Sequence, residues 1–387
     1  MRELKKRYAA VGDAGLSTIV LGEADLAQIV RTIGLDALMD ELIDALEGSL
    51  REHDPMHVEV RKRDGFVYAE PHPGVFEWMP VMESGDHVVV KLVGYNPSNV
   101  DERCLPTILS TMGLYDVRSG HLRALCDGTF PTALRTGAAS AVASRVLARS
   151  DSAVLGLVGC GAQSVTQLHA LSRVFHLRRV LIYDVLPSSV RSFRRRTAFL
   201  DIDIVPASLA QVEREVDILC TATSVEIGAG PVICGTSLKP HVHLNAVGSD
   251  LPGKIELPRQ LLQRALVCPD FLPQAVVEGE CQQLQAGEIG PSLVELVKAP
   301  ERFRAYRDEV TVFDSTGFAL EDKVAFELIL QHAERLGIGR RIQVETTSTD
   351  PRDPYGFIYA DDLLLRAPDT IRRASDGECD HGPGPVG

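Results

Sequence analysis

The stretch from Ala153 to Asp184 places the strongest constraint on how this chain of 387 residues can fold. An apolar run leads into Gly159-Cys-Gly161-Ala-Gln-Ser164, a helical segment follows, and a second apolar run ends in Asp184. A strand, a glycine-rich turn, a helix and a second strand that ends in an acid make up the nucleotide-binding βαβ unit. We therefore predict a parallel sheet that binds a dinucleotide, with a plain strand-to-helix turn as the alternative.

Each residue of this motif has an expected role. Gly159 allows a tight turn, and Gly161 lets the backbone approach a diphosphate at a helix N-terminus, where amide donors and the helix dipole favour anions. Ser164 replaces the usual third glycine and is small enough to preserve helix–strand packing. Asp184 can accept hydrogen bonds from ribose hydroxyls and would repel a 2′-phosphate, so NAD(H) is favoured over NADP(H). The next predicted helix bears a basic face that we expect to be solvated, formed by Arg191, Arg194, Arg195 and Arg196.

Charge and composition disfavour several classes of partner. The formal charge of −13 argues against binding to nucleic acid or to an anionic membrane. No apolar run approaches the ~18 residues of a membrane span, and no signal-peptide core follows the charged N-terminus, so a cytoplasmic location is expected. The eight cysteines form no C-x-x-C pair and the histidines show no ligand spacing, so neither disulfides nor a metal site are expected.

Helices and strands alternate after Asp184, as in a doubly wound α/β sheet. The predicted segments are helix 187–199, strand 202–205, helix 207–213, and strands at 216–220, 242–246, 265–268 and 310–315, followed by helix 318–336. Ligands bind at the carboxyl edge of such sheets. Polar residues near that edge are Thr221, Asn245, Asp250 and Ser315.

The N-terminal third has a different pattern. Helices are predicted after Gly22 and Gly34, and the strands 75–80 and 88–93 form a predicted hairpin. Glu77 and Lys91 lie in these apolar strands, where they either point to water or form a charged pair that faces a substrate pocket. An alanine-rich helix over 134–149 leads into the nucleotide-binding strand, so Arg135 is well placed to bind a carboxylate or a phosphate.

Seven segments resemble the ornithine cyclodeaminase/mu-crystallin family, over about residues 17–335. They are Glu77-Trp-Met-Pro80, Lys91-Leu-Val-Gly-Tyr-Asn-Pro97, Thr132–Ser140, Gly159–Gln163, Asn245–Lys254, Glu278-Gly-Glu280 and Phe313–Asp322. Further segments are similar to the lysine-cyclising members of the family, namely Gly85-Asp-His87, Val93-Gly-Tyr95, Leu105-Pro-Thr-Ile-Leu109 and Thr166–Ser172.

This resemblance implies an α/β fold in which a Rossmann-type NAD-binding domain, residues 137–318, is inserted in an α+β domain. Residues 1–136 and 319–365 would form that second domain, which binds the substrate and makes a homodimer. Residues 366–387 are expected to be a disordered tail.

The resemblance also implies roles for individual residues. Lys91, Arg135 and an upstream arginine would hold the substrate carboxylate; we choose Arg61, with Arg63 as the alternative. Glu77 would orient the substrate, and Asp250 would bind and deprotonate its ω-ammonium group, so Asp250, Glu77 and Lys91 form the expected catalytic set. The expected cofactor-binding residues are Arg135, Thr136, Gly159, Gly161, Ala162, Gln163, Asp184, Thr221, Asn245, Val247, Asp250, Lys254 and Ser315.

The implied reaction is a cyclisation of a small diamino acid. NAD would take the Cα hydride of L-lysine, the ω-amine would attack the resulting iminium, ammonia would leave, and the returned hydride would give L-pipecolate. L-Ornithine, which would give L-proline, is the alternative substrate. The same motifs would also suit an imine reductase, an amino-acid dehydrogenase or a ligand-binding protein without activity.

Overall fold

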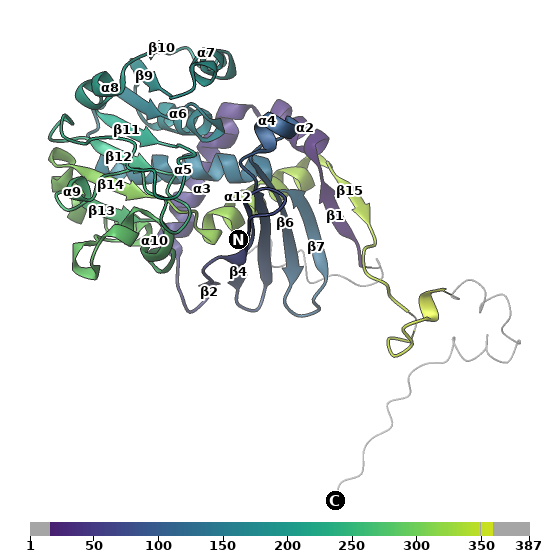
Figure 1. Ribbon diagram of the computed structural model, residues 1–387. Coiled ribbons are helices and arrows are strands. Elements are labelled where there is room, and N and C mark those ends of the chain that lie inside the picture. Colours follow the sequence, from purple (N-terminus) through teal and green to yellow (C-terminus); the bar gives the residue numbers. More distant parts are fainter. Residues whose placement is uncertain (1–15, 349, 359–387) are drawn as a thin grey trace, which may run out of the picture. The chain divides into compact units, whose positions relative to one another are not determined.

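The predicted parallel sheet is present in the computed structural model, which describes residues 16–348 and 350–358 (Figure 1). Its seven strands run in the order β10-β9-β8-β11-β12-β14-β13, and each pairs with its neighbours in parallel. The strands are β8 Val154–Val158, β9 Arg179–Tyr183, β10 Asp203–Pro206, β11 Ile218–Thr221, β12 His243–Ala246, β13 Leu266–Pro269 and β14 Thr311–Asp314. The order reverses between β8 and β11, which is where such sheets bind ligands.

Helices and connecting segments accompany this sheet within the compact unit Thr18–Arg341. They are α6 Ala162–Val174, α7 Pro187–Arg196, α8 Leu209–Glu215, α9 Arg259–Leu262, α10 Leu272–Glu278 and α11 Leu293–Lys298, with the 3₁₀ segments η1 Glu280–Gln283, η2 Ala286–Glu288 and η3 Pro300–Asp308. Helix α7 ends three residues before the predicted end at 199. No helix of the described residues has the length and apolarity needed to cross a membrane.

The second sheet is mixed and has eight strands. They are β1 Thr18–Leu21, β2 Val58–Val60, β3 Asp64–Tyr68, β4 Gly74–Glu83, β5 His87–Tyr95, β6 Ile108–Asp116, β7 Leu122–Asp127 and β15 Arg340–Ile342. Their order is β15-β1-β7-β6-β5-β4-β2, and β3 also pairs with β4. The predicted hairpin is confirmed as β4 and β5, with Met79 opposite Lys91. Alternation along β4 and β5 therefore directs Lys91 and Glu77 to the covered face of the sheet.

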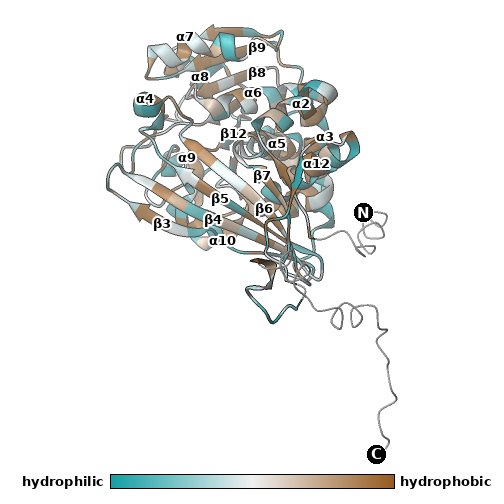
Figure 2. Ribbon diagram, turned by 90° about the vertical axis from the view of Figure 1, so that its right-hand side faces the viewer, coloured by the Kyte–Doolittle hydropathy of each residue, from teal (hydrophilic) through white to brown (hydrophobic). Residues whose placement is uncertain are grey.

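Four helices belong to the N- and C-terminal parts of this unit: α2 Glu23–Ile33, α3 Leu35–Glu52, α4 Asn99–Arg103 and α12 Ala319–Leu336. Apolar residues of α12, among them Phe326 and Ile329, pack against Met79 and Val89 of the inner face. The outer face stays open, and Figure 2 looks onto β3, β4, β5 and β6 from that side. Phe66, which is 66% exposed, and Leu92, which is 41% exposed, lie on these strands.

Helix α5, Thr129–Leu147, joins the two sheets. It begins earlier than predicted because the Asp127 carboxylate accepts hydrogen bonds from the first-turn amides of Thr129 and Phe130, both at 3.2 Å. Gly137 lets α5 approach α6 at backbone distance, since a Cβ there would lie 2.5 Å from the carbonyl oxygen of Thr166. The predicted domain boundary at 136/137 falls inside this helix and stays a prediction, as does the predicted tail, which lies outside the described residues.

Candidate active site

The glycine-rich loop between β8 and α6 has the geometry that a dinucleotide needs. Gly159 has a φ of 91°, and a Cβ there would lie 2.5 Å from the carbonyl oxygen of Ala222. A Cβ on Gly161 would meet nothing within 4 Å, so open space adjoins the N-terminus of α6, where Ala162 and Gln163 form the first turn. Ser164 is buried and donates to the Gly159 carbonyl oxygen at 2.5 Å. The loop is tightly held on one side and open on the other.

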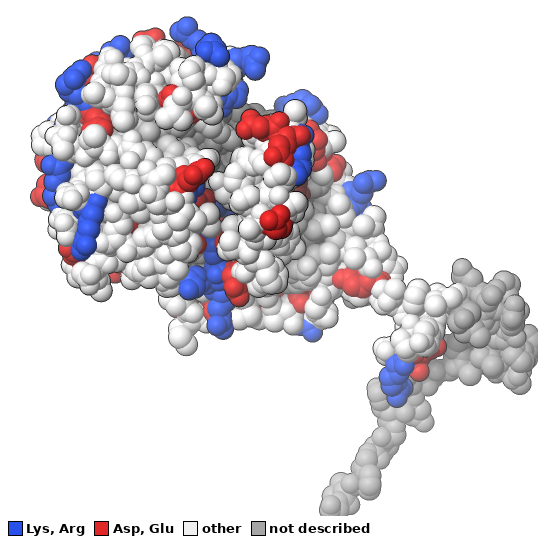
Figure 3. Space-filling model, in the orientation of Figure 1, with Lys and Arg blue, Asp and Glu red and all other residues white. Residues whose placement is uncertain are grey.

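Asp184 follows β9 and lies next to this loop. Its carboxylate accepts hydrogen bonds from the backbone amides of Cys160 and Leu186, each at 2.7 Å. The aspartate therefore orders the loop, and a ribose hydroxyl would have to share the same oxygens. Lys and Arg side chains gather over α7 in Figure 3, and Arg191, Arg194 and Arg195 are exposed. The prediction that Arg196 is solvated with them is wrong, because its guanidinium binds the carbonyl oxygens of Cys160 and Gly161.

Two of the predicted cofactor residues at the sheet edge use their side chains inside the protein. The Thr221 hydroxyl donates to Glu256 at 2.7 Å, and the Asn245 amide donates to Ser144 at 3.1 Å. Glu256 is fully buried and also accepts from Thr223 and from the Gly248 amide. Burial raises the pKa of Glu256, although these hydrogen bonds oppose the shift. These hydrogen bonds link the end of β11 to Glu256 and link β12 to Ser144 of α5.

Ser315 and Val247 complete the predicted set at this edge. Both are buried, and the Ser315 hydroxyl has no hydrogen-bond partner among the described residues. A buried hydroxyl without a partner is costly unless a ligand or water satisfies it. Ser315 therefore fits a residue that binds a polar group of a cofactor.

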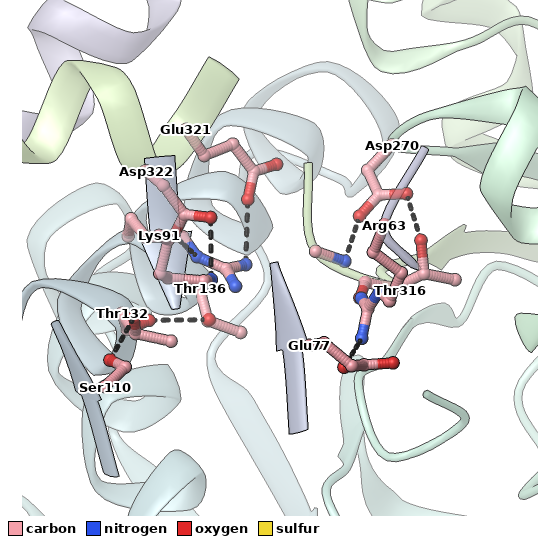
Figure 4. Close-up of polar contacts among 12 residues, drawn as sticks. Arg63, Glu77, Lys91, Ser110, Thr132, Thr136, Asp270, Thr316, Glu321 and Asp322 are labelled. Carbon is pink, nitrogen blue, oxygen red and sulfur yellow. Dashed lines mark hydrogen bonds and ion pairs between the residues drawn. The ribbon is translucent and has the colours of Figure 1, made fainter. Parts of the chain in front are cut away.

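Lys91, Arg135 and two acids of α12 form a buried charged cluster, of which Figure 4 labels Lys91, Glu321 and Asp322. The Lys91 ammonium lies 2.6 Å from Asp322, and the Arg135 guanidinium lies 2.9 Å from Asp322 and 3.0 Å from Glu321. Burial lowers the pKa of Lys91 to about 8, although Asp322 opposes the shift. Burial likewise raises the pKa of Glu321 to about 8 against the effect of Arg135. Thr136, one residue after Arg135, donates to the Thr132 carbonyl at 2.8 Å inside α5.

The arginine upstream of Glu77 in this cluster is Arg63, and the choice of Arg61 needs correction. Arg61 is exposed and pairs with Glu59 at 2.5 Å. Arg63 lies 3.3 Å from Glu77 and 3.0 Å from Glu278, and it donates to the carbonyl oxygen of Thr316. The difference arises because β2 ends at Val60 and β3 pairs with β4 from Asp64 onward. Arg63, the residue before Asp64, is thereby placed next to Glu77.

Two guanidinium groups converge on Gly317, which follows β14. A Cβ at Gly317 would lie 2.9 Å from Nη2 of Arg135 and 3.2 Å from Nη2 of Arg63. Asp270 holds this segment in place, since it accepts from the Gly317 amide at 2.6 Å and from the Thr316 hydroxyl at 3.0 Å. The Nε and Nη1 atoms of both groups already pair with carboxylates of the chain. The two Nη2 atoms lie beside Gly317, where their donors suit a further carboxylate.

Asp250 lies in the loop after β12 and pairs with Lys254 at 2.8 Å. Lys254 is buried, and its ammonium also lies 5.7 Å from the centre of the Tyr95 ring. The charge of Asp250 acts on Arg63, Glu77 and Glu278. Burial raises the pKa of Glu278 to about 7, Arg63 opposes this, and Glu77 and Asp250 add to it. Three carboxyl groups therefore lie close to one arginine.

The described residues also contain one group with the geometry of a metal site, namely Glu83, His87 and Glu327, whose ligand atoms lie within 4.8 Å of one another. The Lys323 ammonium lies 3.0 Å from Glu83 and 2.9 Å from Glu327. A cation of the chain itself thus neutralises both carboxylates. That the protein binds no metal stays a prediction.

The family model of the ornithine cyclodeaminase/mu-crystallin family matches residues 23–336. The chain belongs to this family. It is 43% identical over 343 residues to the L-lysine cyclodeaminase of Streptomyces rapamycinicus, which covers 88% of this chain and 100% of that relative.

Solved structures of the family agree with the fold. A structure that addresses recognition of L-lysine, L-ornithine and L-2,4-diaminobutyric acid by lysine cyclodeaminase has a TM-score of 0.86 and 49% identity, covering 88% of this chain and 99% of that one. An archaeal alanine dehydrogenase dimer with bound NAD has a TM-score of 0.76 and 29% identity, covering 85% and 100%. The chain is thus an enzyme of this family that is similar to lysine cyclodeaminase, and family members bind NAD(H).

Several residues of the site were not assigned from the sequence. They are Glu278, Asp270, Thr316, Glu321 and Asp322. The segments Glu278-Gly-Glu280 and Phe313–Asp322 resemble the family, but Glu321 and Asp322 look like ordinary acids in the first turn of a helix. Only the tertiary contacts show that they pair with Arg135 and Lys91.

Proposed function

We propose that this enzyme converts L-lysine to L-pipecolate and ammonia, with NAD that is used and regenerated in each turnover. The observation that carries the proposal is the convergence of Arg63 and Arg135 on Gly317 beside Lys91, with carboxyl groups of Asp250, Glu77 and Glu278 around the same Arg63. Cationic side chains and carboxyl groups thus lie together in one site. The 43% identity to an L-lysine cyclodeaminase supports the choice of substrate.

The three cations would bind the substrate α-carboxylate. Arginine offers a planar fork of donors that matches a carboxylate, and such charge-assisted hydrogen bonds are strong in a buried site. We assign Arg63, Arg135 and Lys91 to this role. Asp322 and Glu321 keep Lys91 and Arg135 in place without satisfying all of their donors.

The acids would bind the amino groups. A diamino acid carries two ammonium groups near neutral pH, and cyclisation requires that one of them loses a proton and becomes a nucleophile. Asp250 would hold and deprotonate the ω-ammonium, while Glu77 and Glu278 orient the chain beside it. Holding both ends of the substrate in one site brings nucleophile and electrophile together, which supplies much of the rate.

The residues of the parallel sheet fit NAD. Its diphosphate would meet the open space at Gly161 and the amides at the start of α6, and its ribose the acid at the end of β9. Its carboxamide would meet the Ser315 hydroxyl, which has no partner within the part of the chain that the structure describes. NAD bound there would supply the hydride acceptor and donor for the substrate Cα. The protein's own part is to bind, orient and exchange protons with the substrate.

Incubation of the purified chain with NAD and either L-lysine or L-ornithine tests the proposal. We expect L-pipecolate and ammonia in equal amounts from L-lysine, without accumulation of NADH. NADH formed in proportion to consumed amino acid would contradict cyclodeamination and support a dehydrogenase. Faster formation of L-proline from L-ornithine would transfer the proposal to that substrate.

A further inference from the structure

Arg196 lies at the end of α7, and its guanidinium faces the glycine-rich loop. Nη2 donates to the carbonyl oxygen of Cys160 at 2.6 Å, and Nη1 donates to that of Gly161 at 3.2 Å. Nη2 also donates to the carbonyl oxygen of Ser189 at 3.1 Å and to the hydroxyl of Ser192 at 3.3 Å. The planar guanidinium group therefore links the loop to α7 by hydrogen bonds to carbonyl groups of both.

The loop is held from the opposite side as well. Asp184 accepts from the Cys160 amide at 2.7 Å, and the Gly159 amide donates to the Tyr183 carbonyl oxygen at 2.8 Å. The amide and the carbonyl group of Cys160 are therefore each fixed by a charged side chain of opposite sign. This leaves the loop little freedom to rotate its peptide planes.

The orientation of these carbonyl groups decides where the next amides point. A trans peptide is planar, so its C=O and N–H bonds point in opposite directions. Because the carbonyl oxygens of Cys160 and Gly161 face Arg196, the amides of Gly161 and Ala162 face away from it. Neither amide has an acceptor among the described residues, and a Cβ on Gly161 would meet nothing within 4 Å. Both amides thus face open space at the start of the 13-residue helix α6.

We propose that Arg196 is a positioning residue for dinucleotide binding, which directs the amides of Gly161 and Ala162 at the diphosphate by holding the carbonyl oxygens of Cys160 and Gly161. The inference rests on the proposed NAD-dependent function. Arg196 touches no reacting atom, so its loss changes the affinity for the cofactor and leaves the chemical steps intact.

Replacement of Arg196 in the full chain tests this role, with affinities for NAD and ADP-ribose measured by calorimetry. Arg196→Met should weaken both ligands by about tenfold or more, because several charge-assisted hydrogen bonds are lost. Arg196→Lys keeps the charge but cannot bridge the same carbonyl groups, so it should fall between parent and Met variant. Turnover of L-lysine at saturating NAD should stay within about twofold of the parent, since only cofactor binding is affected.

Arg194→Met is the matched control, since it removes the same charge from an exposed position of the same helix. It should leave both affinities unchanged. Equal NAD affinities of the parent and Arg196→Met would overturn the inference and leave the proposed function standing, as would an equal loss in Arg194→Met. A parent chain that binds neither NAD nor ADP-ribose would overturn both. If Arg196→Met lowers the melting temperature, the affinities of Arg196→Lys for NAD and ADP-ribose are compared with those of the parent instead. Unchanged affinities of that variant would contradict the inference.

Discussion

At the scale of residues, burial and nearby cations shift the pKa values of the acids in the candidate site. Glu278 and Glu321 have raised pKa values because they are desolvated, and Asp322 keeps a lowered pKa because Arg135 and Lys91 outweigh the effect of its burial. Neighbouring carboxyl groups of the site therefore differ in charge near neutral pH. A site that takes up and releases protons needs this difference.

Asp250→Asn keeps the size of the side chain and removes its charge. We expect turnover of L-lysine to fall by ~10²–10⁴, the range for loss of a general acid or base. NAD affinity should change far less than turnover, although Asp250 is also an expected cofactor contact. The melting temperature should fall modestly because the buried Lys254 loses the charge of its partner at 2.8 Å. Product formation and NAD titration measure both effects. Glu59→Gln, which breaks only the exposed pair with Arg61, is the control, and near-parental turnover of the Asp250 variant would contradict the assignment.

Glu278→Gln tests the pH dependence of stability. The pKa of Glu278 is raised from 4.5 to about 7, so the folded protein holds this proton in a range where the unfolded chain has lost it. The contribution of Glu278 to the free energy of unfolding should therefore fall by on the order of 1–3 kcal/mol as the pH rises from 4.5 to about 7. Above that pH the contribution should stay constant. Urea unfolding of both proteins at pH 5 and pH 8 isolates this difference. Parallel pH profiles would show that Glu278 is not desolvated.

The residues of the site were only partly predictable. Lys91, Arg135, Glu77 and Asp250 could be placed because each lies in a segment typical of the family. The choice between Arg61 and Arg63 could not be made from the sequence, since it depends on where β2 gives way to β3 along the same partner strand. That change in pairing has no local signal in the sequence.

At the scale of elements, the loop between β8 and α6 separates two uses of glycine. Gly159→Ala should lower stability by about 1–3 kcal/mol, because its φ is 91° and the added Cβ would meet the Ala222 carbonyl oxygen at 2.5 Å. Gly161→Ala should leave the melting temperature unchanged, since nothing lies within 4 Å, yet weaken NAD binding by about tenfold. Thermal unfolding and NAD titration of both variants distinguish the roles. A Gly161 variant with full affinity would place the diphosphate elsewhere.

The strands of the parallel sheet were predicted well because apolar runs alternate with helical segments along the chain. Two other features of the fold, strand β15 and the start of α5, had no such pattern in the sequence. Strand β15 has three exposed residues, Arg340–Ile342, without apolar alternation. The start of α5 depends on the Asp127 carboxylate, and the pair Asp127-Gly128 equally suits a turn.

At the scale of the whole molecule, the open face of the mixed sheet supports the predicted homodimer. Phe66, Phe76, Leu92 and Leu109 are 41–66% exposed on adjoining strands. Monomeric proteins rarely expose a contiguous apolar surface of this kind. We expect the parent chain to sediment as a dimer and the double variant Phe76→Glu, Leu92→Glu to sediment as a monomer. Met56→Glu, which changes an exposed residue of the turn before β2, is the control, and a dimeric double variant would place the interface elsewhere.

The close approach of α5 and α6 at Gly137 limits how mutation can alter the substrate range of this enzyme. Arg135 lies two residues from that contact, and the glycine-rich loop lies at the start of α6. The contact between the two helices therefore sets the separation between the proposed carboxylate-binding and cofactor-binding residues. A larger residue at Gly137 would force the helices apart, since its Cβ would lie 2.5 Å from the carbonyl oxygen of Thr166. Laboratory evolution toward longer or shorter diamino acids should therefore leave α5 untouched and collect its substitutions around Asp250 and on β4 and β5, where the far end of the substrate would lie.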